Sequence, residues 1–129
     1  MFSEPSNDFI ANSSVGIHTV SADGIITYAN QCELEILGYH ELEYVGHHVS
    51  EFQTDHICLD DMLRRLDQNE ILKNYPVKVL GKNSLKYILY NTSAYTEGNK
   101  FVHTRCYGID IEKSVFDLFR EVSPYFKSS

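Results

Sequence analysis

The sequence contains no apolar run near the length of a membrane-spanning helix, which needs about 20 mostly apolar residues. Its three cysteines (Cys32, Cys58 and Cys106) are odd in number and widely separated, which argues against a disulfide framework and a Cys-x-x-Cys metal site. Basic residues are scarce, with 11 Lys and Arg against 18 Asp and Glu. Because nucleic-acid binding needs a basic face, we expect a soluble, cytoplasmic chain with no nucleic-acid partner and no membrane segment.

Catalytic motifs are missing as well. No Ser-His-Asp or Cys-His arrangement can be placed from the sequence, and no glycine-rich loop is present to hold a phosphate group. His47 and His48 are adjacent and would point in different directions, and His103 lies far along the chain, so no spacing matches a zinc site. The histidines could instead form a pH-sensitive element, because imidazole titrates near neutrality. We expect a non-catalytic chain without a metal centre.

The length of 129 residues fits one domain with a substantial core. An Asp-Gly turn at 23–24 separates two β-branched stretches, 15–20 and 25–30, which predicts a β-hairpin. The hydrophobic period then changes, and 31–37 is predicted to form a short helix that ends at Gly38, because glycine is favoured just past a helix C-terminus.

The second half of the chain predicts a longer helix, three strands and a terminal helix. Apolar spacing over Asp60–Leu72 is near-helical, whereas 52–59 shows no clear period. The strands are expected over 75–80, 85–94 and 101–111, and an amphipathic helix over 112–126, interrupted by a proline at position 124. Hairpins that flank a helical block predict an α+β fold, an antiparallel sheet with helices on one side.

One predicted strand is apolar on both faces. Leu85, Tyr87 and Leu89 alternate along it with Ile88 and Tyr90, whereas a strand with one solvated face alternates apolar and polar residues. Something must therefore cover the outer face of the sheet. The N-terminal arm, the C-terminal helix and a second protomer all remain open as that cover.

The motifs over residues 12–113 resemble a PAS domain in order and spacing. The resemblance rests on Asp23-Gly24-Ile25-Ile26-Thr27-Tyr28-Ala29-Asn30, Gly38-Tyr39, Val45-Gly46, Asn30-Gln31-Cys32, and Asp110-Ile111-Glu112, where Glu112 replaces a threonine. It implies a five-stranded antiparallel sheet with short helices on one face and flanking N- and C-terminal helices. The implied divisions are an N-terminal arm or helix over 1–14, the PAS domain over 15–111 and a signalling or linker helix over 112–129.

This resemblance also implies a sensory function. Such domains enclose a pocket between the sheet and the central helices, pass a change there to the terminal helices, and commonly form homodimers. They commonly precede a histidine kinase or a diguanylate cyclase, so we expect the N-terminal sensor of a longer, bacterial-type signalling protein. The effector would be covalently linked after this chain, in two-component or cyclic-di-GMP signalling. A ligand-free interaction and dimerisation module is the alternative.

The resemblance leaves the cofactor unknown. Light-sensing relatives carry a cysteine after the Val-Gly turn, and Val49 stands at that position here, so flavin-cysteinyl photochemistry is not expected. Haem needs an axial ligand, and His56 and Cys58 lie near the position that haem-binding relatives use. An Asp55-His56 pair is more typical of a helix cap or a solvated side chain, so haem is the weaker alternative.

By register with the family, one set of side chains would face a ligand pocket, and a second set would form a dimer or signalling surface. The alternative for the first set is an ordinary filled core, with His18 bonded to a backbone carbonyl. The pocket candidates are His18, Val20, Ile36, Val49, Phe52, Met62, Leu66, Ile88, Tyr90, Thr104 and Cys106. The surface candidates are Tyr87, Leu89, Phe116 and Phe119.

Overall fold

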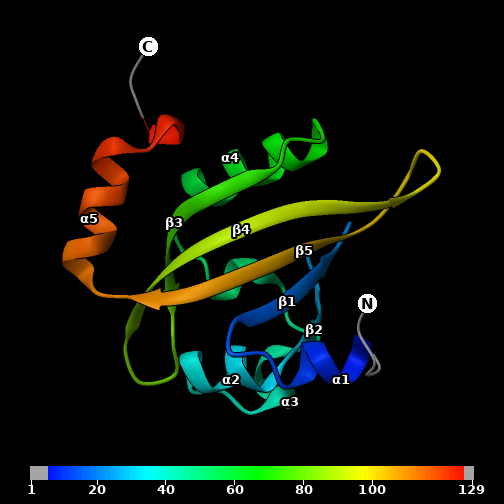
Figure 1. Ribbon diagram of the computed structural model, residues 1–129, viewed down its shortest axis with the longest axis horizontal. Coiled ribbons are helices and arrows are strands. Elements are labelled where there is room, and N and C mark those ends of the chain that lie inside the picture. Colours follow the sequence, from blue (N-terminus) through cyan, green and yellow to red (C-terminus); the bar gives the residue numbers. More distant parts are fainter. Residues whose placement is uncertain (1–5, 127–129) are drawn as a thin grey trace.

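The computed structural model describes residues 6–126, and these form one five-stranded antiparallel sheet with helices against it (Figure 1). The elements in chain order are α1 (Ser6–Ala11), β1 (Gly16–Ser21), β2 (Ile26–Ala29), α2 (Gln31–Leu37), α3 (Glu41–Tyr44), η1 (Val49–Glu51), α4 (His56–Asp67), β3 (Leu72–Leu80), β4 (Leu85–Glu97), β5 (Lys100–Ile111), α5 (Lys113–Val122) and η2 (Pro124–Phe126). The sheet order is β2-β1-β5-β4-β3. The predicted α+β fold is confirmed. The outermost parts of the predicted arm and terminal helix, 1–5 and 127–129, lie outside the described residues.

The β1–β2 hairpin and the start of α2 are held together by local turn and cap chemistry. Gly24 has a φ of 82°, a left-handed conformation that glycine adopts without steric cost. Asn30 caps α2, since its Oδ1 accepts hydrogen bonds from the backbone N–H of Glu33 and of Ile17, both at 2.9 Å. The same side chain therefore ties the first strand to the first core helix.

Helix α4 begins four residues earlier than the apolar spacing predicts. Asp55 is its N-cap, and the Asp55 carboxylate accepts a hydrogen bond from the Cys58 N–H at 3.2 Å. At the other end the helix stops at Asp67, and Leu72 already belongs to β3. The exposed Ile57 in the first turn interrupts the apolar period, which explains why 52–59 gave no clear pattern.

The register of the sheet sorts its side chains onto two faces. On β1, β5 and β4 the residues His18, Cys106 and Thr92 lie directly opposite one another, and all three are buried on the inner face. Helices α2, α3 and α4 cover this face (Figure 1). Within residues 6–126, no helix is long and apolar enough to cross a membrane.

The C-terminal segment covers part of the outer face and wraps around the β3 edge. Phe116 of α5 is buried, and its ring lies 5.0 Å from that of Tyr87 on the outer face. Beyond α5, the Tyr125 ring packs 4.9 Å from Tyr75, which faces the inner side, and the Tyr125 hydroxyl accepts the Lys73 N–H at 2.9 Å. The sequence left three possible covers for the outer face of the sheet. The C-terminal helix is one of them, and it lies over part of this face.

Candidate functional site

The interior between the sheet and helices α2 and α3 contains a buried ionic cluster. His18 of β1 and Glu33 of α2 are both buried, and His18 Nδ1 lies 2.7 Å from Glu33 Oε2. This is an ion-pair distance, although the angle at the ring nitrogen is not that of a hydrogen bond. The hydroxyls of Tyr44 and Tyr90 each donate a hydrogen bond to the same oxygen, both at 3.0 Å. One carboxylate oxygen therefore collects all the donors of the cluster.

The two charges of this cluster support each other. Burial by itself lowers the pKa of His18, but Cys106 and Glu33 raise it, and the net pKa is raised to about 10. Burial raises the pKa of Glu33, but the charge of His18 and the two tyrosine hydroxyls lower it, and the net pKa lies below the ordinary value. At neutral pH the cluster therefore holds an imidazolium and a carboxylate. Burial also raises the pKa values of Tyr44 and Tyr90, so both remain hydroxyl donors.

Close packing of the sheet makes room for the Tyr90 ring. A Cβ atom at Gly108 on β5 would lie 2.6 Å from Tyr90 Cε1 and 2.9 Å from Ile88 Cγ2. Real side chains do not approach so closely, so glycine is required there for the Tyr90 ring to lie across the inner face. The space beside Gly108 is therefore taken up by the Tyr90 ring.

Beside the ionic cluster lies a small cavity of about 20 Å³, under α4. Its lining includes seven predicted pocket residues: His18, Val20, Val49, Met62, Leu66, Thr104 and Cys106. Two unpredicted polar side chains also line it, Gln53 and Thr92, which are only 6% and 1% exposed. Gln53 Oε1 and Thr92 Oγ1 have no hydrogen-bond partner among the described residues. Buried polar atoms of this kind normally bond to a group in the cavity, because leaving them unpaired is costly.

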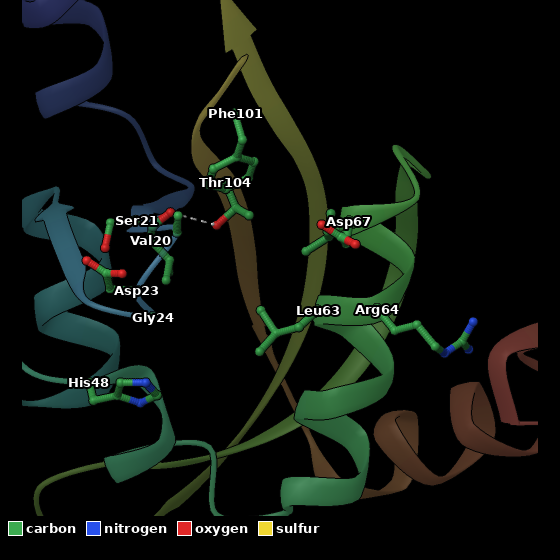
Figure 2. Close-up of a pocket in the computed structure, with 12 residues that line it drawn as sticks. Val20, Ser21, Asp23, Gly24, His48, Leu63, Arg64, Asp67, Phe101 and Thr104 are labelled. Carbon is green, nitrogen blue, oxygen red and sulfur yellow. Dashed lines mark hydrogen bonds between the residues drawn. The ribbon is translucent and has the colours of Figure 1, made fainter. Parts of the chain in front are cut away.

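The cavity adjoins an open groove of about 550 Å³, and the two share Val20, Leu63, Leu66 and Thr104 (Figure 2). The groove runs between α4, the β1–β2 turn and the start of β5, and Asp23 and Asp67 contribute carboxylates to its lining. The Arg64 side chain extends away from the groove in Figure 2, and its guanidinium pairs with Asp61 at 2.7 Å. The groove is therefore acidic where it meets solvent.

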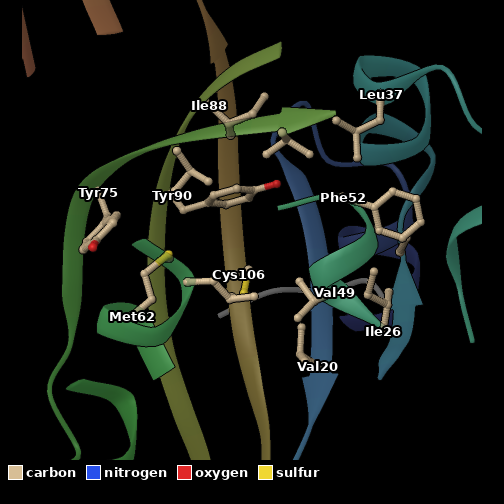
Figure 3. Packing of buried hydrophobic residues seen from close by; sticks show 14 of the residues in the cluster. Val20, Ile26, Leu37, Val49, Phe52, Met62, Tyr75, Ile88, Tyr90 and Cys106 are labelled. Carbon is tan, nitrogen blue, oxygen red and sulfur yellow. The ribbon is translucent and has the colours of Figure 1, made fainter. Parts of the chain in front are cut away.

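The other four pocket candidates lie in the core and not in the cavity lining. Phe52, Ile88 and Tyr90 are buried in the cluster shown in Figure 3, and Ile36 is partly buried against it. The four candidates for a dimer or signalling surface are buried to different extents. Leu89 is buried on the outer face, Tyr87 and Phe116 are in ring contact, and Phe119 is half-buried.

The haem and metal candidates lie outside this site. His56 is exposed at the start of α4, and the Cys58 thiol lies 3.7 Å from the Tyr75 hydroxyl on the side that faces the C-terminal segment. His48 instead caps η1, with Nδ1 accepting the Ser50 N–H at 3.1 Å. Across the described part of the chain, no group of three or more His, Cys, Asp or Glu side chains could hold a metal ion.

Sequence reasoning missed Glu33, Tyr44, Gln53 and Thr92, which supply most of the polar groups of the site. Glu33 follows the Asn30 cap by three positions, where an acidic residue ordinarily lies in solvent and interacts with the helix dipole. Thr92 could have been found from the register, since it lies on the same strand face as Ile88 and Tyr90. Sequence analysis also placed no Cys-His pair, yet the sheet sets Cys106 directly opposite His18.

A five-stranded antiparallel sheet closed by short helices around a polar interior site defines a small α+β domain of the sensory type. Residues 7–111 match the model of the PAS fold, and the chain belongs to this family. PAS domains are generally sensory, non-catalytic modules. No curated protein matches this sequence.

Several solved structures are similar to this chain. One is the PAS domain of an HTR-like protein from Haloarcula marismortui, with 22% identity and a TM-score of 0.70 over 82% of this chain and 94% of that one. A light-oxygen-voltage domain studied with a flavin analogue has 16% identity and a TM-score of 0.80 over 96% and 98%. An RNA-binding light-oxygen-voltage receptor has 16% identity and a TM-score of 0.76 over 86% of this chain, which spans only 33% of that receptor. At these identities the likeness shows the fold alone.

The interior of this chain does not fit a flavin. The cavity of about 20 Å³ is far smaller than a ring system, and the side chains of Phe52, Met62 and Tyr90 occupy the space beside it (Figure 3). Val49, at the position of the photoactive cysteine by the resemblance, is buried and lines the cavity. The cofactor of this chain remains unknown.

Proposed function

We propose that this chain is a cytoplasmic sensory domain that binds a small polar ligand between β1, β5 and α4. The observation that carries the proposal is the pair of unpartnered buried acceptors, Gln53 Oε1 and Thr92 Oγ1, in a cavity that adjoins an open groove. The groove volume of about 550 Å³ is typical of small-molecule sites, which span about 300–1,000 Å³. The body of the ligand would lie in the groove, with one donor group in the cavity.

The charge of the groove narrows the class of ligand. Asp23 and Asp67 line it, and the cavity beyond offers unpaired acceptors. These groups repel anions and favour a neutral or cationic molecule with hydrogen-bond donors. A nucleotide or phosphorylated ligand is therefore disfavoured.

Helix α4 is the element that would carry a signal from the site to the C-terminal segment. Met62 and Leu66 line the cavity, while Cys58 and Arg65 of the same helix contact the tail. A ligand that favours one packing of α4 would shift the population of tail conformations. The effector would be a covalently linked histidine kinase or diguanylate cyclase, and a similar PAS fold occurs in a two-component sensor histidine kinase.

Native mass spectrometry of the freshly purified chain tests ligand binding. We expect wild type to carry extra mass that is lost on denaturation, and Thr92→Val to carry less, because it removes an acceptor without changing side-chain volume greatly. Thr96→Val is the matched control, since Thr96 is exposed on the same strand. A wild-type chain that carries no extra mass, with both variants identical to it, would contradict the proposal.

The second candidate function is a ligand-free dimerisation module, through the outer sheet face or the terminal helices. Two observations favour it: Tyr107 and Ile109 on the outer face remain 40% and 47% exposed, and α5 exposes Val115, Leu118 and Val122. The two candidates are compatible, because self-association through the outer face leaves the groove free.

A further inference from the structure

The Cys106 thiol occupies a position that no step of the proposed ligand binding uses. Cys106 lies on the inner face of β5, directly opposite His18 on one side and Thr92 on the other. It is buried, it lines the cavity, and its Sγ lies 3.9 Å from Thr104 Oγ1. Figure 3 shows the Cys106 side chain among Met62, Val49 and Tyr90 in the middle of the core cluster.

The neighbours of Cys106 are those that activate a thiol. The Cys106 side chain lies on the same face of the sheet as the His18 imidazole, directly opposite it in the strand register, and Glu33 Oε2 lies 2.7 Å from His18 Nδ1. A third group that holds an imidazole in place beside a cysteine is the arrangement found around nucleophilic cysteines. Here the sheet register sets Cys106 opposite His18, and helix α2 places Glu33 beside the imidazole.

The cavity restricts what can reach this sulfur. Its volume of about 20 Å³ is close to the smallest space that holds a single water molecule, which excludes bulky electrophiles. Of its unpartnered groups, Gln53 Oε1 accepts a hydrogen bond, and the Thr92 hydroxyl can donate or accept one. Hydrogen peroxide is among the smallest electrophiles, is neutral, and both donates and accepts hydrogen bonds, so it suits this space better than larger electrophiles do.

We propose that Cys106 is an oxidation site for hydrogen peroxide, held ready by His18 and Glu33 and reached through the Gln53–Thr92 cavity. This inference rests on the proposed role of the cavity as the sensing site. The sulfur attacks one peroxide oxygen, an S–O bond forms and the O–O bond breaks. The sulfur is oxidised by two electrons to a sulfenic acid, and the leaving hydroxide takes up the thiol proton to become water.

The two other cysteines lack this environment. Burial and the neighbouring Glu33 and Glu35 raise the pKa of the Cys32 thiol, which donates to the Ser14 carbonyl at 3.3 Å. Burial also raises the pKa of Cys58, although Arg120 lies close to it. Both thiols are therefore less thiolate-like and should react more slowly.

The oxygen added at Cys106 would press on α4. The cavity offers little free volume, and Met62 and Leu66 of α4 form part of its wall. Close-packed interiors do not absorb an extra heavy atom without movement. The displacement would act on the same helix that contacts the C-terminal segment.

Oxidation in the presence of dimedone, which traps sulfenic acids, tests the inference on the full chain. We expect one adduct in wild type, mapped by peptide mass spectrometry to Cys106, and the same adduct in the double variant C32S/C58S. In C106S the adduct should fall at least about tenfold. Thr92→Val should slow the reaction with Thr96→Val unchanged, and circular dichroism verifies that each variant is folded.

The possible failures are distinguishable from those of the proposed function. Adducts on Cys32 or Cys58, with Cys106 unmodified, overturn the oxidation site but leave ligand binding by native mass spectrometry intact. If Cys106 is oxidised but hydrogen exchange in α5 does not change, Cys106 is an oxidation site, and the sensory role of the cavity is rejected. Labelling of Cys106 only when the chain is unfolded by urea also overturns the inference.

Discussion

At the scale of single residues, the chain places an ion pair where a small domain would ordinarily place apolar packing. Transfer of two charges out of water is costly, and the attraction between them compensates only when additional hydrogen bonds satisfy the carboxylate. Glu33 Oε2 has this support from the hydroxyls of Tyr44 and Tyr90, whereas Glu33 Oε1 has no hydrogen-bond partner among the described residues. His18 is supported mainly by charge, because its ring nitrogen lies near Glu33 without hydrogen-bond geometry. His18 is therefore the partner whose protonation state determines whether the pair is stable.

The raised pKa of His18 predicts a loss of stability in alkaline solution. A group whose pKa is higher in the folded state stabilises that state fully below its ordinary pKa, and this contribution is lost as the pH rises toward the folded value. The free energy of unfolding should therefore decline as the pH rises from 6.5 toward 10. Because the pKa of Glu33 is lowered, stability should also decline as the pH falls below 4.5.

Urea unfolding across this pH range measures the effect. His18→Gln leaves Glu33 buried without its partner and should cost about 3–5 kcal/mol at neutral pH. The free energy of unfolding of this variant should also no longer decline in alkaline solution. His47→Gln is the control, because the His47 side chain is 41% exposed and its ion-pair partner is the exposed Glu51. Parallel pH profiles for wild type and His18→Gln would show that His18 is not the titrating group.

Register explains which site residues the sequence could predict. Register with the family predicted His18, Thr104 and Cys106 to face inward, since a single register fixes the face of every side chain in a strand. Glu33 could not be predicted in the same way, because its burial depends on how α2 packs on β1. A carboxylate in the first turn of a helix gives no local sign that two tyrosines from distant segments will surround it.

At the scale of secondary-structure elements, the C-terminal segment is held by aromatic and cationic contacts around the β3 edge. The Arg120 guanidinium lies 4.8 Å from the Phe116 ring and 4.1 Å from the Phe126 ring, and Arg120 Nε donates to the Pro76 carbonyl at 3.3 Å. Arg65 of α4 lies 5.0 Å from the Tyr125 ring. Edge strands present unpaired backbone groups, so this cover also protects β3 from pairing with other chains.

Removal of the Arg120 contacts should release the tail while leaving the sheet folded. Arg120→Ala deletes two cation–π contacts, the hydrogen bonds to the Pro76 carbonyl and to Cys58 Sγ, and the ion pair with Asp55 at 4.0 Å, a loss of about 1–3 kcal/mol. We expect faster hydrogen exchange in α5 with little change in β1 and β5. Lys113→Ala is the control within the same helix, because its pairing with Asp117 is exposed and should matter little. Equal exchange in α5 for both variants would argue against a tail held by Arg120.

The elements themselves were largely predictable, but their ends were not. Alternating and helical patterns found the five strands and the terminal helix, since each pattern reports one buried face. The start of α4 was placed too late because its first turn mixes an exposed isoleucine with a buried cysteine, and only the Asp55 cap marks the boundary. The wrap of η2 around β3 has no local pattern, because it depends on contacts with side chains far away in the sequence.

At the scale of the whole molecule, two sides of the fold have different characters. The inner side is closed by α2, α3 and α4 and contains the polar site. The outer side is only partly covered, because α5 lies over β3 and β4 and leaves Tyr107 and Ile109 in solvent. Helix α5 contacts both sides of the fold. A conformational change that begins on the inner side would therefore reach α5, and so would the binding of a partner on the outer side.

The exposed stripe of α5 predicts self-association through this side. Val115, Leu118 and Val122 recur at spacings of three and four residues, the pattern of a helix–helix seam, and Leu118 is 56% exposed. Leu118→Glu adds a charge at the centre of this stripe without touching the core. We expect it to weaken dimerisation at least about tenfold, equivalent to about 1.4 kcal/mol, in sedimentation experiments. Leu42→Glu is the matched control, because Leu42 is an 89% exposed leucine on α3, away from the stripe. If both variants dimerise equally, or if wild type is monomeric, α5 is not the dimer contact. Helix α5 would then act only within one protomer.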